Sequence, residues 1–231
     1  MIKQTSLDFL SKLKKNNSKD WFEQNRDLYE HYKTDILELT ENLLTGLSQF
    51  DQSISQANLD PKKCLTRVNR DLRFSKDKTP YKNYVLIVFN KNGFHGNTAG
   101  YYIQIEPGAN FLGGGIWQTT PELLKKIRQE IDYSFNDINK IITSPKFKTI
   151  FPSGIQGVGK LKKMPDGYDE TNQASELLKM KGFCTKEIVS DKMLTSKDCV
   201  AKILDSFKTS KPLIDYINKA IEYDKLKSPN R

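Results

Sequence analysis

The chain has 231 residues, of which 37% are hydrophobic and 28% charged, and its formal net charge is +9. These proportions are typical of a globular protein and exclude a disordered chain. No run of about 18 apolar residues occurs, so the sequence predicts no membrane association, and the N-terminus lacks the apolar core of a secretory signal. We therefore expect a cytoplasmic protein with one domain over residues 1–224 and a frayed C-terminal tail at 225–231.

Residues suited to metal binding or nucleophilic catalysis are few. The three cysteines are widely spaced and form no CxxC pair, so a zinc ribbon is not indicated. His31 lies in a helical pattern and His95 in a turn-like one, which leaves little scope for a Ser-His-Asp triad. We expect no metal and no cofactor.

The N-terminal quarter has helical periodicity. Apolar residues at helical spacing predict a short helix over 6–15, which Asn16-Asn17 interrupts. Ser18 then has the character of an N-cap, and a long amphipathic helix is predicted from there to about Leu47. Residues 48–63 are polar and contain a proline, which is typical of a connection.

The middle of the chain has strand character. Strands are predicted at Cys64–Phe74, Tyr84–Phe89, Gly100–Glu106 and Phe111–Trp117, and the glycine- and asparagine-rich segment 90–97 reads as a hairpin loop. Short links favour antiparallel pairing, because parallel neighbours require long crossover connections.

The second half of the chain is mostly helical. Thr120-Pro121 combines a capping threonine with proline at the first helical position and predicts helices to about Thr143, with a break near 132–136. The remaining predictions are a long loop at 152–170, a short helix at 174–181, a fifth strand at 183–189 and two last helices that begin at Ser196 and at Ser210. Strands in the middle and helices at both ends indicate an α+β fold, with a central, mostly antiparallel sheet of about five strands flanked by N-terminal and C-terminal helices.

The charge is concentrated in one segment. From Lys62 to Lys82, eight basic residues stand against two acidic ones, a net charge of +6, so the other 210 residues carry only +3. A field concentrated in this way attracts anions. Within it, the sequence from Ser75 to Pro80 has turn chemistry throughout, so lysines and arginines on both sides of a turn are expected to converge on one phosphate or carboxylate.

Arg70 is the least ordinary residue of this segment. An extended backbone over 67–73 would place Arg70 on the same face as the apolar side chains of Val68, Leu72 and Phe74. A buried arginine requires an acidic partner or a bound anion. Asp71 and Asp77 belong to the same segment and cannot easily reach it, so we expect a partner from elsewhere, with Glu106 as the candidate.

Two further segments attract attention. The glycines of Gly113–Gly115 interrupt a predicted strand, which indicates either a β-bulge or close approach of the backbone to a ligand, and both explanations stay open. Neither a dinucleotide-binding fingerprint nor a P-loop is present. In the loop that follows residue 160, Lys162 and Lys163, with Lys179 and Lys181 further on, are candidates to extend the basic surface.

Several motifs together resemble a known family. They are Asn17–Phe22, Arg70–Lys82, Tyr101-Tyr102 with Glu106-Pro107-Gly108, Gly113–Trp117, and Leu161–Tyr168 with Leu177–Phe183. The chain resembles the bacterial and fungal family of domain of unknown function 2461 over nearly its whole length. The resemblance implies that the three segments belong together, and it implies no catalytic residue, cofactor or partner.

The sequence thus predicts an anion-binding site, for a phosphate or a carboxylate, in segment 67–82 beside the Gly113–Gly115 strand. The predicted ligand-binding residues are Arg67, Arg70, Asp71, Arg73, Lys76, Asp77, Lys78, Tyr81, Lys82, Tyr102, Glu106, Gly114 and Trp117. The candidate ligands are an anionic small molecule, a phosphate-containing metabolite and a nucleic-acid backbone, although no helix-turn-helix, zinc-finger or KH signature is visible.

Two alternatives stay open at this point. An enzyme acting on a phosphorylated or nucleic-acid substrate would use Asp71, Asp77 and Glu106 as acid–base groups, with arginine and lysine stabilising developing charge. A protein-interaction module would instead dock an acidic partner on the basic segment. The oligomeric state is left undetermined by the sequence.

Overall fold

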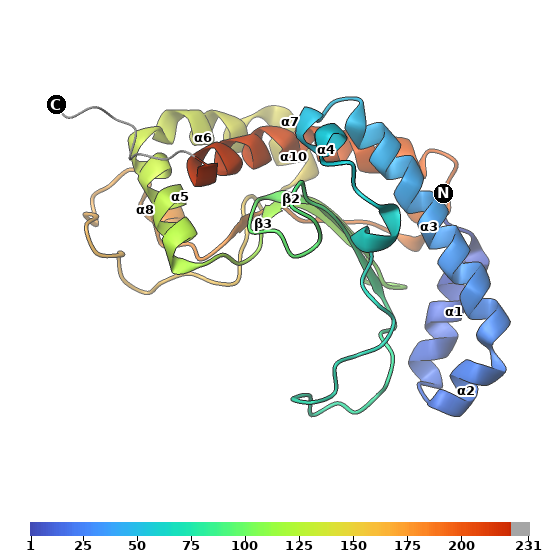
Figure 1. Ribbon diagram of the computed structural model, residues 1–231. Coiled ribbons are helices and arrows are strands. Elements are labelled where there is room, and N and C mark those ends of the chain that lie inside the picture. Colours follow the sequence, from blue (N-terminus) through green and yellow to red (C-terminus); the bar gives the residue numbers. More distant parts are fainter. Residues whose placement is uncertain (223–231) are drawn as a thin grey trace. The chain divides into compact units, whose positions relative to one another are not determined.

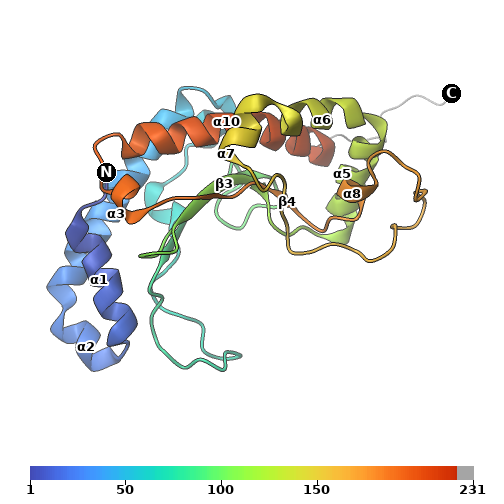
Figure 2. The same ribbon diagram turned by 180° about the vertical axis from the view of Figure 1, so that it is seen from behind.

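The computed structural model describes residues 1–222, and the α+β architecture is confirmed: helices at both ends of the chain flank an open sheet (Figures 1 and 2). Two compact units can be described, each by itself. Unit 1 comprises Met1–Gly96, Tyr101–Leu112 and Glu187–Lys208, and unit 2 comprises, among the described residues, Asn97–Gly100, Gly113–Lys186 and 209–222. The single domain over 1–224 stays a prediction, and the predicted tail at 225–231 lies outside the described residues.

The sheet has five strands in the order β1-β2-β3-β4, with β5 also paired to β3. Their bounds are Val85–Phe89, Gly100–Ile105, Phe111–Ile116, Phe183–Cys184 and Glu187–Ile188. The pairing between β1 and β2 is antiparallel, as predicted from their short link, and the pairings of β3 with β4 and with β5 are antiparallel as well. Val85, Ile87 and Phe89 alternate on the buried face of β1. The fifth strand predicted at 183–189 is instead two strands of two residues each. They are separated at Thr185, whose amide donates to the Gly114 carbonyl and whose side-chain hydroxyl accepts from the Gly114 amide.

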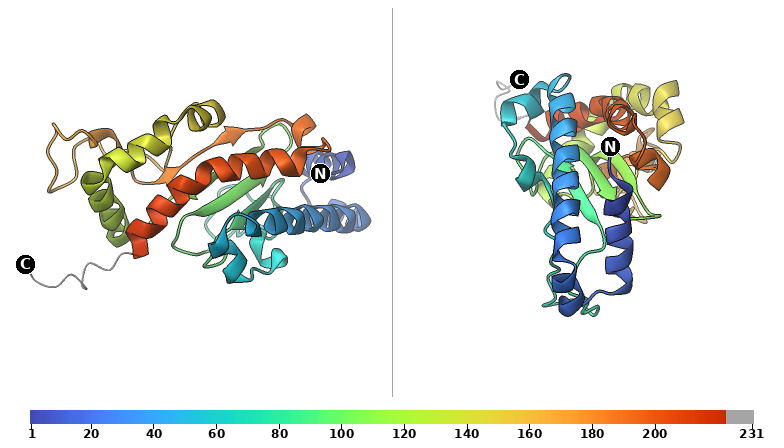
Figure 3. Two further views of the ribbon diagram at one scale, coloured as in Figure 1. Left: turned by 90° about the horizontal axis from the view of Figure 1, so that it is seen from above. Right: turned by 90° about the vertical axis from the view of Figure 1, so that its right-hand side faces the viewer.

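The helices of unit 1 are α1 (Gln4–Lys15), α2 (Lys19–Gln24), α3 (Arg26–Ser48), α4 (Gln52–Ala57), a 3-10 turn (Pro61–Cys64), α9 (Asp191–Leu194) and the first part of α10 (Cys199–Glu222). Ser18 caps α2 as predicted, since its hydroxyl accepts a hydrogen bond from the amide of Trp21 at 3.2 Å. The predicted single helix from Ser18 to Leu47 is wrong: it divides at Asn25, whose side chain donates to the Trp21 carbonyl at 2.8 Å. α1 and α3 pack side by side (Figure 3).

Residues 67–82, called the arm below, form a two-limbed projection of unit 1. Isolated antiparallel bridges join Leu65 to Ile87 and Asn69 to Tyr81, and the pairing stops at Arg70, whose amide donates to the Pro80 carbonyl at 2.9 Å. The arm extends away from β1 and β2 in both views (Figures 1 and 2). The strand predicted at Cys64–Phe74 is therefore wrong. The turn at Ser75–Pro80 ends the ladder, and Phe74 is 95% exposed, so Phe74 adds no buried apolar surface beside Arg70.

The helices of unit 2 are α5 (Pro121–Tyr133), α6 (Phe135–Thr143), α7 (Pro145–Ile150) and α8 (Ser175–Leu178). Thr120 caps α5, and the break predicted near 132–136 is found at Ser134. The helix predicted from Ser196 is α10, which begins at Cys199, whereas the separate helix predicted from Ser210 is wrong, because α10 continues through Pro212. Burial of the following turns, as at Leu213 and Ile217, outweighs the hydrogen bond that proline removes. Within residues 1–222, no helix combines the length and the apolarity that crossing a membrane requires.

Candidate functional site

The base of the arm is fixed to the helices of unit 1. The side-chain amide of Asn17 donates to the Tyr81 carbonyl at 2.9 Å, and its oxygen accepts from the Tyr81 amide at 3.0 Å. The Tyr81 ring stacks on Phe22 with centroids 4.1 Å apart. Tyr81, a predicted ligand-binding residue, is thus buried and serves to anchor the arm.

Arg70 finds its partner inside the arm. Its guanidinium donates to the carboxylate of Asp77 and, at 2.6 Å, to the hydroxyl of Thr79. The predicted partner Glu106 is wrong, because the turn between the two limbs brings Asp77 back beside Arg70. The amide of Thr79 and the guanidinium of Arg70 together lower the pKa of Asp77 to about 2.

A second pair lies at the tip of the arm. Arg73 donates from Nη2 to Oδ2 of Asp71 at 2.7 Å and from Nε to Oδ1 at 3.0 Å, which is bidentate geometry. These bonds lower the pKa of Asp71. The Arg73 guanidinium also lies 6.0 Å from the ring centroid of Phe74, a cation–π contact at a fully exposed site. The tip therefore presents an aromatic ring beside a cation.

The remaining cations of the arm have no carboxylate partner. Lys82 donates to the carbonyls of Arg67 and Asn69 at 2.7 Å each, and burial, followed by the nearby charge of Arg70, lowers its pKa. Lys78 donates to the Leu72 carbonyl at 3.0 Å. Within residues 1–222, no carboxylate lies within 4.0 Å of the four cationic groups of Arg67, Lys76, Lys78 and Lys82. The arm therefore keeps four positive charges that its own acids do not neutralise.

A hollow of about 410 Å³, called the base hollow, lies where the arm meets β2. It is lined by Arg70, Asp71, Lys82, Asn83, Tyr84 and Glu106, four of which the sequence predicted as site residues. Glu106 accepts hydrogen bonds from Asn83 at 3.0 Å and from Gln104 at 3.1 Å. Asn83 was missed by sequence reasoning, and its only signal is its place next to Lys82. Two basic and two acidic groups line this hollow, so it has no formal net charge to favour an anion.

The glycine segment Gly113–Gly115 has a structural explanation within unit 2. A side chain at Gly114 would place its Cβ 2.5 Å from the Ser210 hydroxyl, and one at Gly115 would place it 2.1 Å from the Phe183 carbonyl oxygen. Gly115 also has φ +126°, which side chains rarely adopt. The close backbone approach predicted from the glycines is therefore made by the protein itself, by β4 and α10.

The other predicted site residues are dispersed. Trp117 is 55% exposed and, like Gly114, belongs to unit 2, whereas the other predicted residues belong to unit 1. Tyr102 lies on β2 with its ring edge-on to Phe111, at a centroid distance of 6.2 Å. Within residues 1–222, no group of three or more histidine, cysteine, aspartate or glutamate side chains is placed to hold a metal ion.

Comparison with known proteins yields one match. The model of the family described as conserved hypothetical protein (DUF2461) matches residues 5–216. No curated protein and no solved structure matches the chain.

Proposed function

Since the chain belongs to the conserved hypothetical protein family DUF2461, whose description assigns no activity, we propose a function from its own geometry. The arm binds single-stranded nucleic acid: its lysines and Arg67 contact the phosphate backbone, and Phe74 stacks on an unpaired base. The observation that carries this proposal is the near-complete exposure of Phe74 beside Arg73, at the tip of a cationic projection.

Phe74 contributes almost no packing energy to the folded protein, because its ring is exposed to water. Full burial of a phenylalanine side chain stabilises a protein by about 1.5–3 kcal/mol relative to leaving it exposed. The Phe74 ring is 95% exposed and contacts the Arg73 guanidinium. Aromatic rings presented among cations are the elements on which single-stranded nucleic-acid binders stack bases, because every base has a π-face.

The distribution of charge favours an extended polyanion over a small anion. Arg67 and Lys82 lie near the base of the arm, whereas Lys76 and Lys78 lie near its tip, so the four cations follow the projection and do not surround one cavity. The base hollow between them has balanced charge. A chain of phosphates contacts such a row of cations one after another, and each contact releases counterions.

Arg70 and Arg73 have a supporting role in this proposal. The pairs Arg70–Asp77 and Arg73–Asp71 cross-link the turn and hold the tip in one shape. A preformed shape lowers the entropy lost when a ligand binds. The base, fixed by Asn17 and the Tyr81–Phe22 stack, keeps the projection directed away from β1 and β2.

The test is fluorescence anisotropy with a labelled oligothymidylate and an oligouridylate of equal length, at several salt concentrations. Base stacking on one aromatic residue contributes about 1–3 kcal/mol, so Phe74→Ala is expected to weaken binding by about 5- to 150-fold. The double variant Lys76→Gln/Lys78→Gln is expected to reduce the salt slope of log K by about 1.4, since each phosphate contact on a single strand contributes about 0.7.

Two matched controls accompany these variants. Tyr133→Ala removes an aromatic ring that is 88% exposed on α5, and Lys12→Gln/Lys15→Gln removes two exposed charges from α1 of the same unit. Both are expected to leave affinity within about twofold of the wild type. Absence of salt-dependent binding by the wild type, or equal losses in the test and control variants, would overturn the proposal. Competition by polyglutamate equal to that by the oligonucleotide would instead favour an acidic protein partner.

A further inference from the structure

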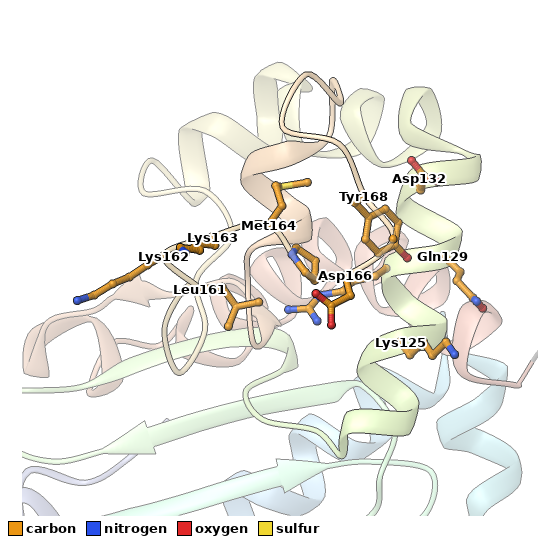
Figure 4. A pocket seen from close by; sticks show the side chains of 12 residues that line it. Lys125, Gln129, Asp132, Leu161, Lys162, Lys163, Met164, Asp166 and Tyr168 are labelled. Atoms are coloured by element: carbon orange, nitrogen blue, oxygen red, sulfur yellow. The ribbon is translucent and has the colours of Figure 1, made fainter.

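A hollow of unit 2 lies between helix α5 and the loop of residues 161–168, and it is called the α5 hollow (Figure 4). Its volume is about 930 Å³, which falls within the roughly 300–1,000 Å³ typical of small-molecule sites. It is lined by Lys125, Arg128, Gln129, Asp132, Leu161, Lys162, Lys163, Met164, Pro165, Asp166, Gly167 and Tyr168. None of these residues belongs to the arm.

Arg128 is the residue of this hollow whose polar groups are least satisfied. Its Nη2 donates to the Met180 carbonyl at 3.0 Å, but its Nε is buried and has no hydrogen-bond partner in residues 1–222. No carboxylate within that part of the chain lies within 4.0 Å of its guanidinium, and burial lowers its pKa. Arg128 lines the hollow, and the bond to Met180 uses only one of its guanidinium N–H groups, which leaves others for an anionic ligand.

Three acids of this region are held by other groups. The loop is closed by an antiparallel bridge between Lys160 and Met180, and Lys160 and Lys179 form ion pairs with Glu176 and Glu170. Asp132 accepts a hydrogen bond from the Asn172 amide at 2.5 Å. Each of these carboxylates thus has a partner other than Arg128.

Tyr168 supplies a second donor. Its side chain lies against α5, whereas Lys162 points away from that helix (Figure 4). Its hydroxyl has no hydrogen-bond partner among residues 1–222. Burial raises the pKa of Tyr168, with the charge of Asp132 acting in the same direction and that of Arg128 opposing it. The hydroxyl therefore keeps its proton at neutral pH and is available to donate.

The charge and polarity of the lining favour an anionic ligand that also has an apolar part. Four basic and two acidic side chains line the α5 hollow, a net charge of +2, in contrast to the balanced base hollow. Leu161, Met164 and Pro165 add half-buried apolar surface beside the charged groups.

We propose that the α5 hollow binds a small molecule with an oxyanionic head group, a carboxylate or a phosphate, which accepts hydrogen bonds from the guanidinium of Arg128 and from the hydroxyl of Tyr168. The rest of the ligand contacts Leu161, Met164 and Pro165. This site is independent of nucleic-acid binding by the arm.

The experiment titrates the full chain with inorganic phosphate and, separately, with citrate, while sodium chloride keeps the ionic strength constant. Binding is followed by the ¹⁵N–¹H resonance of Arg128 Nε, which is assigned by its loss in Arg128→Lys. Either probe is expected to shift this resonance in a saturable way, and the tighter probe identifies the head group. A resonance that moves with neither probe would overturn the proposal.

Variants distinguish ligand binding from a purely structural role of Arg128, in which it only donates to the Met180 carbonyl. Tyr168→Phe removes only a hydroxyl without a partner, so the fold is retained, and the probe is expected to bind about 3- to 10-fold more weakly. Lys148→Gln, which removes an exposed charge on α7 outside the lining of the hollow, is expected to change affinity by less than about twofold, because an exposed distant charge contributes little. A Tyr168→Phe variant that binds the probe as the wild type does would contradict the assignment. Oligonucleotide binding should be unchanged in Tyr168→Phe, so failure here and failure of the arm proposal are distinguishable.

Discussion

The arm of unit 1 and the glycine segment of unit 2 were joined into one predicted site, yet they have opposite physical characters. The arm is exposed, and its polar groups are satisfied by neighbours a few residues away, as in Arg70–Asp77 and Arg73–Asp71. Gly113–Gly115 is buried, and its contacts come from chain segments about 70 to 100 residues distant, at Phe183 and Ser210.

The contrast teaches that unusual composition has more than one cause. Charges in the arm are retained at little cost to the fold because water and local partners solvate them, which leaves that surface free for a ligand. The glycines are required by sterics, because β4 and α10 approach too closely for a Cβ atom. Substitutions should therefore cost stability in the glycine segment and binding in the arm.

The largest expected effect on the free energy of unfolding is that of Gly115→Ala. Its Cβ would lie 2.1 Å from the Phe183 carbonyl oxygen at φ +126°, so either β4 or β3 must move. Strained backbone and a forced main-chain shift together are expected to lower the free energy of unfolding by about 3 kcal/mol or more, measured by urea denaturation. Gly108→Ala is the matched control, because Gly108 has φ +77° with nothing within 4 Å, and its expected cost is about 1 kcal/mol. Equal losses at the two positions would show that contact with β4 is unimportant.

A smaller loss of stability is expected for Gly114→Ala. The new methyl group would meet the Ser210 hydroxyl at 2.5 Å and Cδ1 of Ile214 at 2.7 Å, which are side-chain atoms able to move. Overpacking of this kind typically costs about 1–3 kcal/mol. In Gly114→Ala/Ser210→Ala the loss should be less than the sum of the single losses, because removal of the hydroxyl makes room. Additive losses in this double-mutant cycle would exclude the steric explanation.

In the arm, we expect the Arg70–Asp77 pair to affect the pH at which the Asp77 carboxyl titrates. Because the folded-state pKa of Asp77 is lowered from its ordinary value to about 2, its pairing is complete above the ordinary carboxyl pKa and is lost as the pH falls toward 2. A ¹³C carboxyl titration by NMR should give a midpoint near 2. Arg70→Gln should raise that midpoint only partly, since the Thr79 amide is the larger cause. A midpoint at the ordinary value in the wild type would mean that the pair does not form in solution.

What sequence reasoning could reach was local. The strand predicted at Tyr84–Phe89, the cap at Ser18 and the Thr120-Pro121 helix start depend on neighbouring residues, and the structure confirms each. The helix boundary at Asn25 was not found, because no strong breaker stands there.

The features that sequence reasoning could not predict depend on contacts between residues that are distant in the sequence or are brought together by the path of the chain. The partner of Arg70 is decided by the path of the turn, which returns Asp77, and the role of Gly114 is decided by Ser210. Arg128 gave no signal, because one arginine in an amphipathic helix is ordinary until its guanidinium is found buried without an acid. Local charge density located the arm but did not reveal which of its charges are already paired.

The smallest effect on stability, and the sharpest test of the contrast, is expected for Phe74→Ala. The side chain is 95% exposed, and surface substitutions of this kind usually change the free energy of unfolding by no more than about 0.5 kcal/mol. Urea denaturation of Phe74→Ala should therefore match the wild type while oligonucleotide affinity falls. Phe22→Ala is the opposing control, because Phe22 is buried in contact with Tyr81 and its removal should cost about 3–5 kcal/mol. If Phe74→Ala unfolds as readily as Phe22→Ala, the arm tip packs against the protein in solution and is not presented to a ligand.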